Sequence, residues 1–177
     1  MFEEYIQDAH RFFEQAQGAV NDDEAIARSY YRASIFCAAS AVESFVNFIA
    51  DTFEKGQSMS HHELAYLSDK AFYFDPKKGV LLEKTEFHRL EDKLKFLLIK
   101  FSPSFDFNNA AWSQLIMFKR LHDKLIHPKQ LEDQTSLAIY EKQLRLGIRG
   151  NIQIMNELSK AIFSKPLRRK ILDMRPD

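Results

Sequence analysis

The sequence predicts an all-α protein, an up-and-down bundle of four to five helices. Gly and Pro are scarce, with five of each among 177 residues, and this disfavours sandwiches and barrels that need many tight turns. Apolar residues recur with the ~3.6-residue period of a helix over four long segments. The aromatic residues are mostly Phe, 16 in all, which fits a dry core. The length suits a single domain over residues 1–177, with its core at about 2–164 and a basic tail at 165–177.

The first third of the chain predicts two helices. The first covers residues 2–18. The second follows an Asn-Asp-Asp cap at residues 21–23 and runs to Glu54. Its centre is apolar on most sides, which is typical of the middle helix of a bundle. Within that centre, Ser34 to Ile49, a narrow polar stripe consists of Ser40, Glu43, Ser44 and Asn47.

Residues 57–84 are less regular, and we expect an irregular middle to the bundle there. Ser60-His-His-Glu63 predicts the cap of a short helix that extends to about Phe72. Asp75-Pro-Lys-Lys-Gly79 predicts a turn.

The second half predicts three helices separated by chain breaks. A helix is expected from about residue 85 to 101, before a Ser-Pro-Ser sequence. The next begins at Asn108 or Asn109 as N-cap and ends just before Pro128. The last runs from about 132 to 163, before a Lys-Pro sequence.

The end of the helix before Pro128 is the most informative stretch. The chain has 25 basic and 25 acidic residues, so any contact with nucleic acid must come from a local patch. Only Asp123 opposes the positive charge in these turns. The basic and proton-transfer residues are Lys119, Arg120, His122, Lys124, His127 and, just beyond the helix, Lys129. We interpret Lys119, Lys124 and Lys129 as candidate phosphate or RNA contacts.

Together, three segments resemble the HEPN superfamily of helical, nucleotide- and RNA-associated domains. Ala38-Ala-Ser-Ala-Val-Glu-Ser-Phe-Val-Asn47 is similar to the long family helix, in which a Glu precedes an Asn by one turn. Leu121-His-Asp-Lys-Leu-Ile-His-Pro128 is similar to the signature helix end, an Arg followed by four to six residues and a His. Glu91-Asp-Lys-Leu-Lys-Phe96 resembles the helix that usually precedes it. The resemblance covers residues 20–165 or so.

This resemblance implies a metal-independent endoribonuclease of the toxin or defence type, in which a ribose 2′-hydroxyl attacks the adjacent phosphate. It implies a homodimer whose two motif helices face each other, with RNA as substrate and an antitoxin or other protein as a further partner. His127 would transfer protons and Arg120 would bind the phosphate. The family also contains non-catalytic interaction modules with a degenerate site, and this alternative stays open.

The spacing of the motif departs from the usual family pattern, in which the Arg most often stands five positions before the His. His122, not Arg, stands five positions before His127, while Arg120 stands seven before. At ~100° per residue, Arg120, Asp123 and His127 share one stripe, and His122 points away from it. His122 has an ordinary pKa of ~6.5 and lacks the permanent charge of Arg, so it is expected as a second acid–base group.

Each candidate also has a structural interpretation. His127 suits a helix C-cap, and His122 suits a core edge or a subunit interface. Lys119, Arg120 and Lys124 suit a solvated helix face. Glu43 lies in an apolar helix and needs a partner if it is buried, so we expect it to pair with a cation or hydrogen-bonding group of another helix. Glu43, Asn47 and Asp123 are expected to support the site.

Other classes of function lack their sequence signals. No Cys-x-x-Cys or His-Glu-x-x-His pattern occurs, so we expect no metal, and no Gly-rich phosphate loop occurs, so we expect no nucleotide hydrolysis and no cofactor. No apolar run of ~20 residues is evident, so no membrane span is expected. The N-terminus lacks the pattern of a signal peptide, and the single Cys37 fits a reducing compartment. We therefore expect a cytoplasmic protein.

Overall fold

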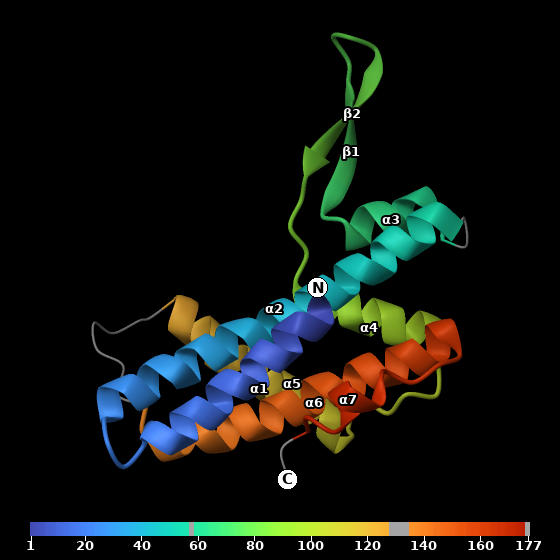
Figure 1. Cartoon of the computed structure of the whole chain (residues 1–177). Coiled ribbons are helices and arrows are strands. Elements are labelled where there is room, and N and C mark those ends of the chain that lie inside the picture. The colour runs from blue at the N-terminus through green and yellow to red at the C-terminus, as the bar shows by residue number, and fades with distance from the viewer. Residues whose placement is uncertain (57–58, 128–134, 176–177) are drawn as a thin grey trace.

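The computed structural model describes residues 1–56, 59–127 and 135–175, and these are mostly helical (Figure 1). The four longest helices form the bundle, and the shorter helix at residues 90–101 packs against two of them. A two-stranded hairpin projects from the bundle beside a short helix. The elements in chain order are α1 (Phe2–Ala19), α2 (Glu24–Gly56), α3 (His61–Leu67), β1 (Lys70–Asp75), β2 (Val80–Thr85), α4 (Leu90–Phe101), α5 (Ala110–Ile126), α6 (Leu137–Phe163) and α7 (Arg169–Leu172).

The central position of α2 is confirmed. It contacts α1, α5 and α6, and it contributes buried residues along its whole length. At its first half, the ring of Tyr31 stacks on that of Tyr140 from α6, with centroids 6.1 Å apart and an angle of 7° between the planes. By length and composition alone α2 is apolar enough to cross a membrane, contrary to the expectation from sequence. However, 56% of its most apolar window is buried inside the bundle, as in the core helix of a globular protein.

Two glycines bring α6 against α5. A Cβ atom at Gly147 would lie 2.4 Å from Cδ2 of Phe118. One at Gly150 would lie 2.8 Å from Cβ of Gln114 and 2.9 Å from the carbonyl oxygen of Ala111. These distances are shorter than van der Waals contact, so the two helices pack closely only because both positions lack a side chain.

Side chains cap the starts of four helices, and three of these caps were predicted from the sequence. At α2, Asp23 accepts from the N–H groups of Ala25 and Ile26. Ser60 and Glu63 form a capping box at α3, in which each side chain accepts a hydrogen bond from the other residue's backbone N–H. Asn109 caps α5 by accepting from the N–H of Trp112, 2.8 Å away. Ser136 caps α6 in the same way. The last helix therefore begins a few residues later than the sequence indicated.

The expectation of an irregular middle is wrong, because residues 70–85 form an antiparallel hairpin. Tyr73 pairs with Leu82 and Phe74 with Leu81, and the predicted turn joins the strands. Gly79 has a φ of 65°, which favours glycine. Helix α3 accordingly stops at Leu67, and α4 begins at Leu90. The fold is thus a helical bundle with one small sheet.

The base of the hairpin is tied to the bundle by one ion pair. The Nζ atom of Lys93 in α4 lies 2.7 Å from Oδ2 of Asp69, and the Lys93 side chain is only 7% exposed. The other carboxylate oxygen of Asp69 accepts from the N–H of His88 at 2.8 Å. Burial raises the pKa of Asp69, but the bonds to Lys93 and His88 outweigh it and the pKa lies below its ordinary value.

Candidate functional site

Helix α5 carries the motif residues: Arg120 and Lys124 are exposed, whereas Lys119, His122 and Asp123 are partly buried beside the core. Its buried residues are Trp112, Leu115, Phe118 and Leu121. The helix ends at Ile126, and the N–H of His127 donates to the carbonyl of Asp123 at 2.9 Å. The backbone of His127 has left the helical conformation, so this residue is the C-cap that its structural interpretation predicts. Pro128 and the predicted contact Lys129 lie outside the described residues.

Asp123 is neutralised within α5. Its carboxylate lies 2.5 Å from Nζ of Lys119, one turn earlier, and 3.6 Å from Nδ1 of His122. Burial raises the pKa of Asp123, but the hydrogen bonds and charges of Lys119 and His122 together outweigh burial, and the net pKa is below the ordinary value. Lys119 is therefore paired with a carboxylate of its own helix. This pairing favours a structural role for Lys119 over the predicted contact with a phosphate.

His122 lies at the edge of the core. Its side chain is 17% exposed, and its ring meets that of Phe36 edge-on, with centroids 5.9 Å apart and an angle of 79° between the planes. Because Phe36 belongs to α2, this contact holds the imidazole between two helices.

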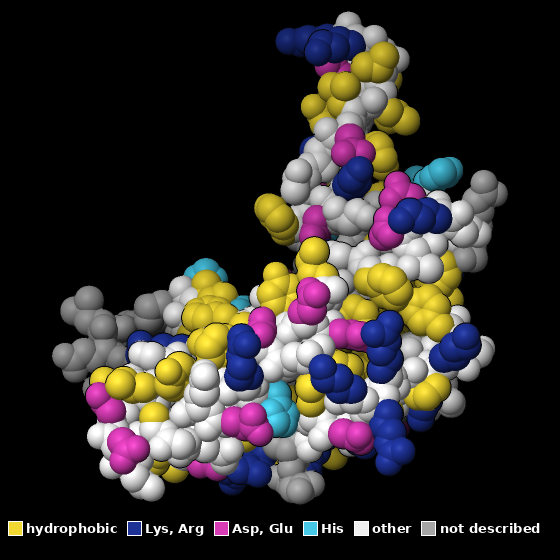
Figure 2. Space-filling model, in the orientation of Figure 1, with side chains coloured by type: hydrophobic (Ala, Val, Ile, Leu, Met, Phe, Trp, Pro, Cys, Tyr) yellow, Lys and Arg dark blue, Asp and Glu magenta, His cyan; other side chains and the backbone are white. Residues whose placement is uncertain are grey.

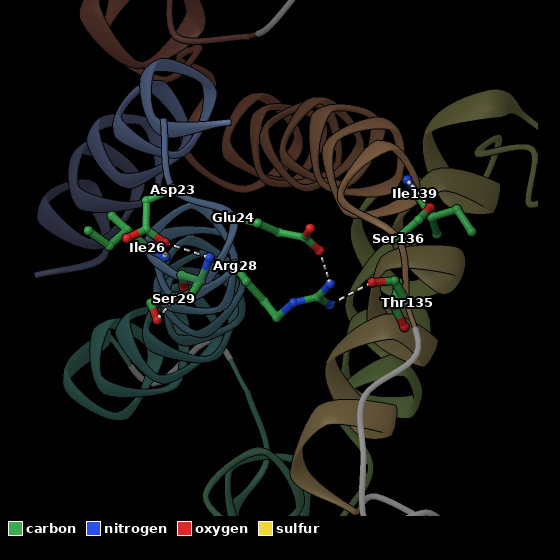
Figure 3. Close-up of polar contacts among 9 residues, drawn as sticks. Asp23, Glu24, Ile26, Arg28, Ser29, Thr135, Ser136 and Ile139 are labelled. Atoms are coloured by element: carbon green, nitrogen blue, oxygen red, sulfur yellow. Dashed lines mark hydrogen bonds and ion pairs between the residues drawn. The ribbon is translucent and has the colours of Figure 1, made fainter. Parts of the chain in front are cut away.

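Thr135 joins the end of α5 to the starts of α2 and α6. Its carbonyl oxygen accepts from Arg28 at 2.6 Å, and Arg28 also pairs with Glu24 at 2.8 Å (Figure 3). Its hydroxyl accepts from Nζ of Lys124 at 2.9 Å. The guanidinium of Arg28 lies over the ring of Tyr140. Lys124, predicted as a phosphate contact, is thus part of this junction.

Arg120 and His127 differ from these residues. Both side chains are exposed, and within the described part of the chain neither makes a hydrogen bond or ion pair. They are seven positions apart, ~10 Å of helix rise, and a separation of seven residues returns to nearly the same side of a helix. Since Lys119 holds Asp123 between them, the stripe offers a free guanidinium and a free imidazole.

A cavity of about 210 Å³ lies where α2, the start of α4, α5 and α6 meet. Its apolar wall includes Val42, Leu90 and Phe118. Its polar lining consists of Glu43, Arg89, Glu91, Lys119, His122, Asp123 and Asn151. The cavity therefore brings together four residues selected from the sequence, Glu43, Lys119, His122 and Asp123, but it does not include Arg120 or His127.

Asn151 was missed by sequence reasoning and is the most unusual residue of the lining. It is completely buried; its Nδ2 donates to the carbonyl of Ala38 at 3.3 Å, while its Oδ1 has no hydrogen-bond partner. A carbonyl only accepts, so this bond settles the orientation of the amide. The signal in the sequence was a polar residue between the apolar positions Ile148 and Ile152.

The expectation for Glu43 is wrong. Its side chain is exposed, and in the described residues it has neither a hydrogen bond nor an ion pair. Asn47, one turn on, is exposed as well. The polar stripe of α2 faces outward at the rim of the cavity, so water hydrates the carboxylate and no internal cation is required.

The cavity is not suited to phosphate. Two cations, Arg89 and Lys119, face three carboxylates, those of Glu43, Glu91 and Asp123, so the lining has one net negative charge with His122 neutral. Among the described residues no group of three His, Cys, Asp or Glu side chains is placed to hold a metal ion. The surface suited to a phosphate is instead the stripe of Arg120 and His127.

Comparison with known protein families, curated proteins and solved structures finds no match to this chain. The functional assignment therefore depends on the geometry of the site.

Proposed function

We propose that the chain is a HEPN-like, RNA-associated cytoplasmic protein, and that two copies form a metal-independent endoribonuclease site from Arg120 and His127. The observation that carries this proposal is the pairing of an unpartnered guanidinium and an unpartnered imidazole on one exposed stripe of α5. Guanidinium groups bind phosphate, and imidazole transfers protons near neutral pH.

One subunit supplies too few groups for the reaction. His122 lies at the core edge against Phe36, which leaves His127 as the exposed imidazole of the stripe. A two-fold axis beside α5 would place a second His127 and a second Arg120 across the phosphate and double the positive field there.

The reaction follows from these roles. One His127 imidazole accepts the proton of the ribose 2′-hydroxyl while the 2′-oxygen bonds to phosphorus. The other, as imidazolium, donates its proton to the 5′-oxygen as the bond between phosphorus and that oxygen breaks. Arg120 stabilises the negative charge that develops on the phosphate oxygens. The products are a 2′,3′-cyclic phosphate and a 5′-hydroxyl.

A second function is favoured by other contacts of the same helix. Lys119 and Lys124 are bound within the chain, and His122 stands where the family most often has Arg. These features support a non-catalytic interaction module, for which an antitoxin or another protein would be the partner.

Single substitutions separate the two functions. His127→Ala should abolish cleavage and leave helix content unchanged, whereas Arg120→Ala should weaken both cleavage and RNA binding. His122→Ala should have a smaller effect. His61→Ala is the matched control, because His61 is an exposed imidazole at the start of α3. Activity retained in His127→Ala, or a monomer that cleaves RNA equally well, refutes the mechanism. Absence of cleavage of any RNA by the wild type supports the interaction module.

A further inference from the structure

The hairpin of β1, its turn and β2, residues 70–85, forms an arm that projects from the bundle (Figures 1 and 2). Hydrophobic side chains lie along the arm, and basic side chains gather at its end (Figure 2). Phe72, Tyr73, Phe74, Val80 and Leu81 are between 45% and 71% exposed. Phe87, just after the arm, is 86% exposed. The arm thus places large apolar side chains in water.

The strand register puts apolar residues on both faces of the arm. Residues paired directly across two antiparallel strands share a face, and neighbours along a strand alternate between faces. Phe72, Phe74 and Leu81 therefore form one face. Tyr73, Val80 and Leu82 form the other. A hairpin that covers a single core would have one apolar and one polar face, so the arm is built to lie between two surfaces.

The exposed area is enough for an interface between two copies. An aromatic side chain offers ~150–250 Å². With the exposed fractions above, the six side chains present roughly 600–700 Å² per chain, or about 1,300 Å² for a pair. This lies within the ~1,200–2,000 Å² of stable protein interfaces. An isolated two-stranded hairpin is only marginally stable in water. Contact with a second copy would therefore stabilise the arm.

The charges indicate how two arms would align. At the end of the arm Lys77 and Lys78 have no side-chain hydrogen bond or ion pair in the described chain, and their N–H groups bind Asp75. At its base, on the rim of the cavity, Glu43 and Glu91 are carboxylates without a partner in the described residues. A six-residue strand is ~20 Å long, so the end of one antiparallel arm reaches the base of another. A parallel pair would bring the lysines together.

We propose that the arm is a dimerisation element through which two copies of this chain clasp each other. The arms lie antiparallel, with one apolar face against the partner's arm and the other against its bundle. Lys77 and Lys78 then meet Glu43 of the partner subunit and Glu91 of the partner subunit. Each copy thereby completes the open rim of the other's cavity.

The composition of the arm favours a second copy over RNA or a membrane. Lys70 and Lys84 are paired with Glu83 and Glu86, so positive charge remains only at the end of the arm. Val80 and Leu81 offer no ring for stacking on bases. The end that would enter a membrane first is Pro-Lys-Lys-Gly, which carries no apolar side chain suited to lipid.

Sedimentation of the full chain over a range of concentrations tests the clasp. The wild type should be a dimer at micromolar concentration. Phe74→Glu with Leu81→Glu should raise the dissociation constant about 100-fold, because it buries carboxylates in the apolar contact. The matched control is Ile99→Glu with Ile139→Glu, which places the same charges at exposed apolar positions of α4 and α6 and should leave association unchanged.

The charge alignment has its own test. Lys77→Glu with Lys78→Glu should weaken association about tenfold, and Glu43→Lys with Glu91→Lys in the same chain should restore it. Circular dichroism should show unchanged helix content in all variants. A wild type that is monomeric at these concentrations, or arm variants that associate like the control, overturn the clasp. Arm variants that lose RNA binding at unchanged mass also overturn it and make the arm an RNA contact. Arm variants that associate like the control beside a dimeric wild type overturn the clasp alone, whereas a monomeric wild type also removes the two-subunit site of the proposed function.

Discussion

Replacing Gly150 by Ala should destabilise the protein, although Ala is the better helix former. In the middle of a helix the exchange alone would stabilise by ~1 kcal/mol. At this position the new Cβ would lie 2.8 Å from Cβ of Gln114, 2.9 Å from the Ala111 carbonyl oxygen and 3.0 Å from the Leu115 nitrogen. Two of these atoms belong to the backbone of α5 and cannot rotate away, so the helices must separate.

Overpacking of this kind costs ~1–3 kcal/mol, which exceeds the gain in helix propensity over most of that range. Because the clash involves backbone atoms, the upper half of that range applies, and subtracting the ~1 kcal/mol gain leaves a net loss of ~1–2 kcal/mol in the free energy of unfolding. Each kcal/mol lowers the melting temperature by ~2–4 °C in a chain of this size. Gly147→Ala should behave alike, because its Cβ would strike the buried ring of Phe118. Urea unfolding followed by circular dichroism measures both.

Gly18→Ala is the matched control for these variants. Gly18 also lies in a helix, and a Cβ atom added there would meet nothing within 4 Å, so the same exchange should stabilise the protein by ~0.5 kcal/mol near the helix end. The close packing of α5 on α6 is wrong if Gly150→Ala is as stable as the wild type while Gly18→Ala shows its expected gain.

Two further predictions concern charged pairs outside the site. Asp69→Asn should destabilise the protein by ~3 kcal/mol, because it keeps the hydrogen bond from the His88 N–H but leaves the buried ammonium of Lys93 unpaired. Adding Lys93→Met should recover most of this loss, as measured by thermal unfolding. For Glu63, chiefly the hydrogen bond from Lys100 lowers the pKa to about 2, below its unfolded value of ~4.3. Its contribution to stability is therefore complete above the unfolded pKa and is lost as the pH falls toward 2. Lys100→Met should flatten the dependence of the urea midpoint on pH in that window, and an unchanged slope would contradict the assignment.

The helices could be predicted from sequence because their signals are local. Side-chain caps such as Ser60 and Asn109 and the apolar period of the chain are readable within a few residues. The strands could not be predicted in this way. Alternation of apolar and polar residues marks a strand only when one face is buried, and both faces of Phe72-Tyr-Phe74 are exposed. The turn at residues 75–79 was predicted, but it was placed in an irregular segment instead of between two strands.

The site was predictable only in part. The i, i+4 spacing of Lys119 and Asp123 is a local pattern, whereas the bond between Lys124 and Thr135 depends on how α5 meets α6. Glu43 was expected inside the bundle because a helix pattern does not reveal which side of its polar stripe faces water. Asn151 joins the cavity through the close approach of two helices, which no spacing within one segment predicts.

The most direct measurement is the chemistry of RNA ends after incubation of the dimer with single-stranded RNA in the presence of a chelator. The proposed mechanism predicts 2′,3′-cyclic phosphate and 5′-hydroxyl ends from the wild type and none from His127→Ala. Ends with a 3′-hydroxyl, cleavage that the chelator stops, or equal cleavage by His127→Ala would contradict it.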